Sequence, residues 1–217
     1  SLAQSVDGAA AVPPGASAAA YNVTVAGVSG PGHLRIMPGD AAGSPTSALN
    51  WAAADERIAN ASVVSLDAAG RMKVHNGSGE PVRVVVDVMG YFQPAAGALF
   101  HPTSPMRVAD TRQPGAGGGA LTPGESRAIA VAGAGTPAGA DAVVANTTVT
   151  GTGGAGHLRV FPSDAPLTHT SMVNWPAPGV TRSNAGAVQV AADGGLSLYN
   201  GSGSSLHVVV DVVGYYR

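Results

Sequence analysis

The sequence contains no cysteine, and charged residues make up only 11% of it. Without cysteine, the chain can form no disulfide, has no thiolate nucleophile and offers no thiolate ligand to zinc. The formal net charge is −2, which provides no basic stripe for phosphate groups, so we expect neither nucleic acid nor an acidic membrane as a partner. Apolar runs fall short of the roughly 18 residues of a spanning helix, and we expect no membrane insertion.

Sequence motifs of common enzyme classes are also missing. There is no Gly-x-Ser-x-Gly elbow, no His-Glu-x-x-His and no glycine-rich phosphate loop followed by Lys-Ser/Thr. No histidine has a second metal ligand at a suitable spacing. We therefore expect no enzyme activity, no cofactor and no bound metal.

Glycine and proline, in contrast, are abundant, with 31 and 16 residues. They indicate many turns and leave little room for long helices. The strands expected in the first half cover residues 21–26, 34–37, 62–66, 71–75 and 82–88. The last two flank Asn76-Gly77, which predicts a type I′ hairpin, although the loop is longer than two residues and its register stays open.

The second half of the chain repeats the first. Asn22-Val-Thr-Val matches Asn146-Thr-Thr-Val, and Val84-Val-Val-Asp-Val matches Val208-Val-Val-Asp-Val, both at an offset of 124 residues. This period exceeds the roughly 20 to 50 residues of a solenoid unit, so each copy is expected to be a domain with its own core. Five or more short strands per copy predict an all-β fold of two tandem β-sandwich-like modules.

The two copies differ at their starts. We expect modules at 1–93 and 101–217, joined by a linker at 94–100. The second copy opens with Pro105-Met-Arg-Val-Ala-Asp-Thr-Arg112, whereas the equivalent positions of the first copy would lie before Ser1. The first module is therefore expected to lack its opening strand. Either the fragment was cut inside a longer array, or another chain supplies that strand.

These motifs resemble a repeat family of exported proteins in high-GC actinobacteria. Its pattern runs from Arg-x-x-Asp-Thr-Arg through Asn-x-Thr-Val and Asn-Trp to Val-Asp-Val-x-Gly-Tyr, and it covers nearly all of 8–92 and 101–217. The resemblance implies β-rich accessory modules of secreted, extracellular or cell-wall-associated proteins, and it brings no catalytic residues. The first copy departs from the family by having His75 where Tyr199 keeps the preferred tyrosine.

Several repeated polar residues are expected to form structural networks. Asp87 and Asp211 lie inside valine runs, where an ionised carboxylate needs a partner, and we predict a structural bridge to an arginine. The candidate arginines are Arg35 and Arg159, which recur in both copies, and Arg107 and Arg112, which flank the opening motif of the second copy. A clamp for a carboxylate or a sugar is the alternative. The other members of the predicted network are Asp110, His33, His157, Asn22 and Asn146. Repeated asparagines are expected to satisfy loop backbone groups.

The large aromatic residues are the candidate ligand-binding residues. Trp51, Trp175, Tyr91 and Tyr215 could stack on the apolar face of a sugar ring. The alternative is that each tryptophan fills a module core and each tyrosine ends a strand against its sheet.

Three functional hypotheses remain from the sequence. The first is a non-catalytic module that binds a cell-wall or surface glycan, or a partner protein, and it predicts exposed tryptophans. The second is an assembly subunit of a secreted filament or toxin-like particle, whose open sheet edge accepts a strand from another chain. The third, a hydrolase, lacks a catalytic constellation. Duplication favours binding, because linked weak sites gain avidity.

Overall fold

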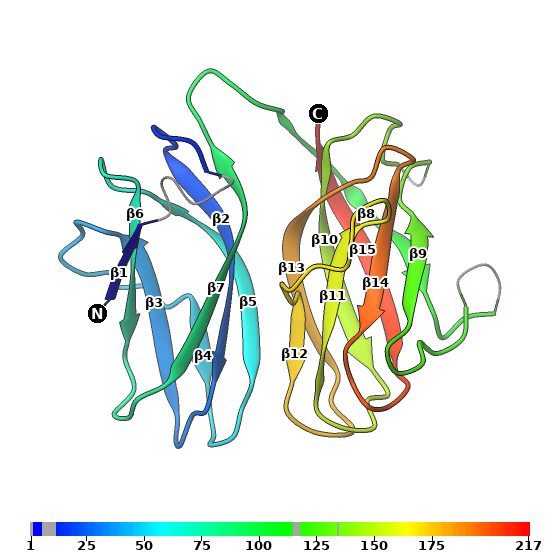
Figure 1. The fold of residues 1–217 in the computed structure, drawn as a ribbon, viewed down its shortest axis with the longest axis horizontal. Coiled ribbons are helices and arrows are strands. Elements are labelled where there is room, and N and C mark those ends of the chain that lie inside the picture. The colour runs from blue at the N-terminus through cyan, green and yellow to red at the C-terminus, as the bar shows by residue number, and fades with distance from the viewer. Residues whose placement is uncertain (1, 6–11, 115–117, 134) are drawn as a thin grey trace. The chain divides into compact units, whose positions relative to one another are not determined.

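The structure is a computed structural model that describes residues 2–5, 12–114, 118–133 and 135–217. All regular elements in this part of the chain are β-strands, named β1 to β15 (Figure 1). The chain divides into two compact units, Ser1–Gly97 and Ala98–Arg217, which we call module 1 and module 2. The described residues form no helix capable of crossing a membrane.

Module 1 contains two antiparallel sheets. The first has the order β1 (Leu2–Ser5), β6 (Arg71–Asn76), β3 (Gly32–Pro38) and β4 (Leu49–Trp51). The second has the order β5 (Ile58–Ser65), β2 (Ala18–Ala26) and β7 (Arg83–Phe92).

Module 2 repeats this arrangement with one additional strand. Its first sheet has the order β9 (Ser126–Ala130), β14 (Gly195–Asn200), β11 (Gly156–Pro162) and β12 (Val173–Trp175). Its second sheet has the order β13 (Arg182–Gln189), β10 (Ala142–Thr150), β15 (His207–Tyr216) and β8 (Phe100–Asp110). The bounds of β10 to β15 follow those of β2 to β7 at the offset of 124, as in β10, where 142 − 18 = 124.

Each module is a β-sandwich, since the core of module 1 draws side chains from both sheets. Tyr21 and Val23 come from the β2 sheet, while Leu34, Trp51 and Met72 come from the other, and all are buried in one cluster. Apolar side chains alternate along β10, whose odd-numbered residues are buried, as one face of a strand against a core requires. The predicted all-β, two-module sandwich fold is confirmed.

The predicted hairpin between β6 and β7 is wrong, because these strands belong to different sheets. A type I′ turn needs positive φ at both central residues, and neither Asn76 nor Gly77 has it. The Asn76 side chain instead donates to the carbonyl oxygen of Glu80 at 2.8 Å and accepts from the N–H of Ser78 at 2.9 Å. The loop that it organises carries the chain across the sandwich.

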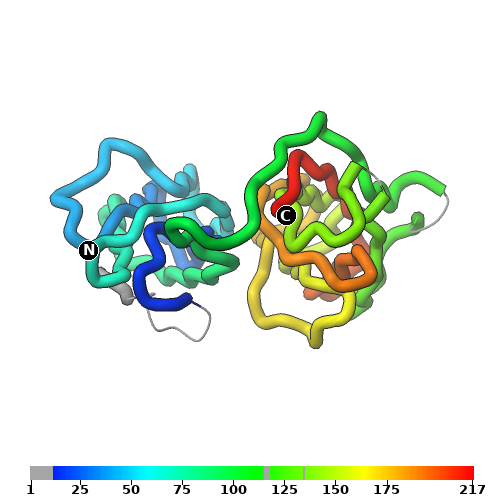
Figure 2. Tube along the Cα trace, turned by 90° about the horizontal axis from the view of Figure 1, so that it is seen from above, coloured from blue at the N-terminus to red at the C-terminus, as the bar shows by residue number. Residues whose placement is uncertain are grey.

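The modules differ at one edge of the β2 and β10 sheets. In module 2, β8 pairs with the outer side of β15, and the ends of both strands are joined by hydrogen bonds between Leu99 and Arg217. Figure 2 shows the start of module 2, in green, beside the red C-terminal end. In module 1, β1 takes the place of β9, but no described strand pairs with the outer side of β7. This side of β7 is called the open edge below.

Amide hydrogen exchange should detect the open edge. The N–H and C=O of Val208 face β8, since they bond to Thr111 at 2.8 and 3.0 Å. The offset places the same groups of Val84, and by alternation those of Val86, on the open edge. We expect the amides of Val84 and Val86 to exchange about 10- to 100-fold faster than those of Val208 and Val210.

The amides of Val85 and Val209 are the internal control, because they point toward the inner neighbouring strand and should be protected in both modules. Equal protection of Val84 and Val208, measured by NMR, would show that the edge is already covered.

Candidate functional site

In module 2 the edge that corresponds to the open edge of module 1 is occupied, because β8 pairs with β15. Arg107 lies opposite Asp211, His101 opposite Tyr215 and Phe100 opposite Tyr216. Two register shifts interrupt the ladder, one beside Asp211 and one before Gly214. The strand therefore follows the shape of β15 through three side-chain contacts as well as through backbone pairing.

The first contact is an ion pair. Arg107 donates from Nε and Nη2 to the two carboxylate oxygens of Asp211, at 2.9 and 3.2 Å. Arg112 binds Asp110 in the same bidentate manner, at 2.8 and 2.7 Å. Such fork-to-carboxylate pairs fix orientation as well as adding energy. The structure thus brings together Arg107, Asp110, Arg112 and Asp211.

Several effects together lower the pKa of Asp110 from its ordinary value of 3.8 to about 2. The largest is the side-chain hydrogen bonding from Arg112; the Arg112 backbone N–H and the charges of Arg112 and Arg107 act in the same direction, and desolvation opposes them. The following Thr111 is buried, and its hydroxyl accepts the Val208 N–H and lies 3.2 Å from Nδ1 of His207. The Asp-Thr-Arg segment thereby locks the end of β8 onto β15.

The second and third contacts involve aromatic rings. Phe100 lies so close to Gly214 that a Cβ there would overlap its ring, and its ring centroid is 5.3 Å from that of Tyr216. His101 stacks on Tyr215 with centroids 5.0 Å apart. Gly214 therefore leaves room on β15 for an aromatic side chain. We call the space above Gly214, and the equivalent space above Gly90, the glycine notch.

The open edge of module 1 keeps the matching residues. Asp87, Gly90 and Tyr91 correspond to Asp211, Gly214 and Tyr215. A Cβ at Gly90 would meet no described atom within 4 Å, so module 1 keeps the notch and no described side chain fills it. Val85 is 56% exposed, whereas its counterpart Val209 is 4% exposed.

Arg107 makes the predicted bridge to Asp211, whereas Arg35 and Arg159 do not reach the aspartates. Both arginines lie on β3 and β11, in the opposite sheet from Asp87 and Asp211. Each donates from Nε to Nε2 of a histidine two residues earlier, at 3.1 Å. Arg159 also donates to the carbonyl oxygen of Thr168 at 2.7 Å and lies over a tyrosine ring.

His33 and His157 have a second structural role. Their rings lie where a Cβ at Gly77 or Gly201 would be. The histidine ring, rather than the geometry of a turn, therefore requires the glycine in each repeated Asn-Gly pair. The described residues include no group of three His, Cys, Asp or Glu that could hold a metal.

Both tryptophans are core residues, which contradicts the exposure that a sugar platform requires. Trp51 is 4% exposed and Trp175 is fully buried. Their indole N–H groups donate to the carbonyl oxygens of Gly30 and Gly154, at 2.7 and 2.6 Å. Tyr91 is exposed, while Tyr215 stacks on His101, so the four candidate rings form no common surface.

The repeated asparagines hold strands and loops together. Asn60 and Asn184 donate to the carbonyl oxygens of Ala48 and Met172, at 2.7 and 2.8 Å. Asn22 lies opposite Asp87 in the strand register, and Asn146 lies opposite Asp211.

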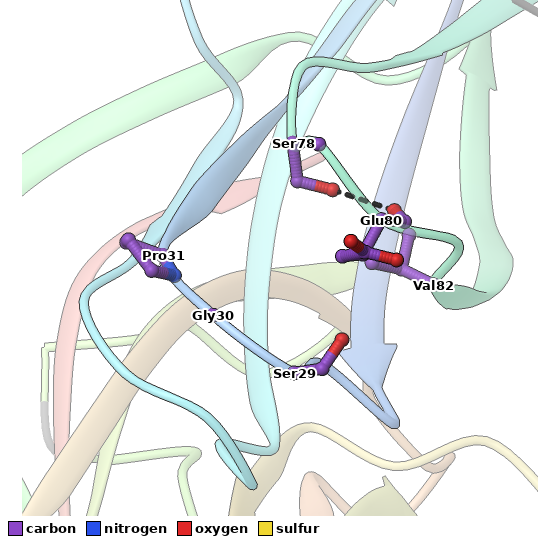
Figure 3. Close-up of a pocket in the computed structure, with 7 residues that line it drawn as sticks. Ser29, Gly30, Pro31, Ser78, Glu80 and Val82 are labelled. Atoms are coloured by element: carbon purple, nitrogen blue, oxygen red, sulfur yellow. Dashed lines mark hydrogen bonds between the residues drawn. The ribbon is translucent and has the colours of Figure 1, made fainter.

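A hollow in module 1 offers little to a small molecule (Figure 3). Ser29, Gly30 and Pro31 face Ser78, Glu80 and Val82 across it, and the Ser78 hydroxyl donates to the Glu80 carbonyl oxygen at 2.8 Å. Its cavity volume is about 20 Å³, far below the roughly 300 Å³ of typical ligand pockets. The open edge is the stronger candidate site.

Comparisons with known proteins add little. No family model matches the chain, and no curated protein matches it. It is similar to a chain in a solved structure described as "Structure of infectious bursal disease virus Gx strain", with 10% identity over 93% of this chain and a TM-score of 0.24. The match spans 62% of that viral chain. So low a TM-score supports no inference.

Sequence reasoning missed the glycine notch and the aromatic contacts of Phe100 and His101. The signal was the identity of Gly90-Tyr91 and Gly214-Tyr215, because a glycine repeated inside a strand often marks a close approach. It could not identify what approaches.

Replacing a buried tryptophan should destabilise its module. Trp175→Ala should lower the free energy of unfolding of module 2 by about 3–5 kcal/mol, since it removes a large buried ring. Exposed Leu167→Ala should change it by less than about 0.5 kcal/mol. Urea unfolding followed by hydrogen exchange measures both. A fully stable Trp175→Ala variant would contradict the core role.

Acid should weaken module 2 through Asp110. The pKa of Asp110 is depressed in the folded state, so its stabilising effect is complete above about pH 4 and is lost as the pH falls toward 2. Asp110→Asn should therefore be less stable than the wild type at pH 7, and this difference should shrink toward pH 2.

Unfolding of a Trp51→Phe background, in which Trp175 fluorescence reports on module 2, measures this difference. Exposed Asp141→Asn is the control and should stay close to the wild type throughout. A difference that is constant from pH 7 to 2 would show that the Asp110 carboxylate has no stabilising role.

Proposed function

We propose that this protein is a non-catalytic, extracellular binding module, in which module 1 takes up on its open edge an extended strand from outside the described residues. The observation that carries the proposal is the strand-by-strand correspondence of the modules, with β8 present on β15 and no described strand on β7. The extracellular location follows the family resemblance of the sequence.

The amino acids of the two edges support this proposal. β8, the edge strand of module 2, contains Pro102 and Pro105, and prolines block further strand addition. β7 is ten residues long and contains no proline. A long, valine-rich edge without such protection is a template for pairing with another chain.

Strand addition would also complete the core of module 1. Val84, Val86 and Val88 pack against the core but are only partly buried, whereas Val208, Val210 and Val212 have no exposed surface. Pairing would cover this apolar surface and satisfy the outward backbone groups of β7, which are the two energetic sources of β-strand recognition.

Exchange of β8 between copies cannot by itself supply this strand. The described chain has two acceptor edges, on β7 and β15, and one strand of the β8 type. A copy that donates β8 to a neighbour leaves its own β15 unpaired, so the number of open edges is unchanged. The strand-exchange form of the assembly hypothesis therefore gains no pairing, and a strand from outside the described residues is needed.

Supplying the strand within one chain tests the proposal. Residues 98–125 placed directly ahead of Ser1 should dock on β7, protect the amides of Val84 and Val86 from exchange and raise the urea midpoint of module 1. Trp51 fluorescence in a Trp175→Phe background follows module 1 alone. The free energy of unfolding of module 1 should rise by about 2–4 kcal/mol, which is less than the burial of several large apolar side chains contributes in a core.

A scrambled insertion of the same composition is the matched control. If the native and scrambled insertions give equal midpoints and equal amide exchange, β7 is not a strand acceptor and the proposal is wrong.

A further inference from the structure

We infer that the partner strand is of the β8 type, antiparallel to β7, with an arginine opposite Asp87 and an aromatic side chain in the notch at Gly90. This inference rests on the proposed function and specifies its partner. It is carried by three features that hold β8 on β15 and recur on β7, namely the register shift, the aspartate and the glycine, although His207 is replaced by Arg83 and Tyr216 by Phe92.

The backbone shape of the two acceptor strands is the first part of the match. β2 pairs with β7 through a register shift between Ala20 and Tyr21, and β10 pairs with β15 through a shift between Val144 and Ala145. These shifts coincide at the offset of 124. An incoming strand therefore meets the same irregularity on β7 that β8 follows on β15.

The ion pair is the second part. Asp87 stands on β7 where Asp211 stands on β15, and Asp211 receives a bidentate contact from Arg107. An extended strand laid on β7 in the β8 register brings its own arginine to the Asp87 carboxylate. Arginine is favoured over lysine here, because only the guanidinium fork reaches both oxygens at once.

The notch is the third part, and it selects the residue at the start of the incoming strand. Phe100 occupies the space above Gly214, and the equivalent space above Gly90 holds no described atom. The neighbouring Tyr91 is exposed, while its counterpart Tyr215 stacks on His101. The expected partner thus begins with an aromatic residue followed by a ring that stacks on Tyr91.

A synthetic peptide of residues 98–112 added to the full chain tests the inference. We expect 1:1 binding by fluorescence anisotropy, with chemical-shift changes at Val84, Val86 and Tyr91. An Arg107→Ala peptide should bind about 10- to 100-fold more weakly, as expected for the loss of a charge-assisted bidentate contact.

Gly90→Ala is the sharpest variant. The added Cβ meets open space in the free module and Gly90 has no positive φ, so stability should be unchanged. The same Cβ would collide with the ring of residue 100 of the peptide, and affinity should fall about tenfold or more. A Phe100→Ala peptide should bind the wild type and the Gly90→Ala variant equally.

The outcomes separate the two proposals. If an alternating Val/Thr peptide without arginine or aromatic residues binds as tightly as 98–112, the edge accepts strands but the inferred recognition is wrong. Binding of 98–112 that is indifferent to Gly90→Ala would mean exchange into β15, which also overturns it. A stable dimer formed through the β7 edges, if the peptide does not dissociate it, would also overturn the inference. If no peptide binds and the insertion of residues 98–125 fails to dock, the proposed function falls too.

Discussion

A β-strand at a sheet edge presents backbone N–H and C=O groups that must be hydrogen-bonded by water, by a side chain or by another strand. In module 2 these groups of β15 are paired by β8, whose Pro102, Pro105 and Arg107 are exposed. In module 1 the groups of β7 face outward in the part of the chain that the structure describes. The difference in valine burial and the notch at Gly90, which no described side chain fills, both follow from this one unpaired edge.

The architecture could be predicted largely from the sequence, because the offset of 124 imposes the same strands on both halves. The strands expected at 71–75 and 82–88 correspond to β6 and β7, but the hairpin expected between them is wrong. An Asn-Gly pair favours a hairpin only when its backbone adopts positive φ, and here the His33 ring explains the glycine. The three-residue β4 was missed because so short a strand shows no period.

The candidate site was harder to predict, because its contacts join residues that the sequence does not relate. Arg35 recurs as regularly as Asp87, yet the two lie in different sheets. The arginine that pairs with an aspartate at this position of the strand is Arg107, which binds Asp211. Repetition identifies residues that the fold retains without saying which sheet each belongs to. The tryptophans show the same ambiguity, since a repeated aromatic residue is expected both in a core and in a binding platform.

Comparison of the two acceptor strands gives the strongest reason to regard the β7 edge as used. Positions away from the β8 contacts have diverged, as Met89 against Val213 and Val82 against Leu206 show, and so has His207, which contacts Thr111 and is Arg83 in module 1. The aspartate, the glycine and the first tyrosine that contact β8 in module 2 are identical in module 1. A β7 that faced only water would gain from a proline or a lysine and would have no need of the notch. The retained side chains are those that a strand on this edge would contact.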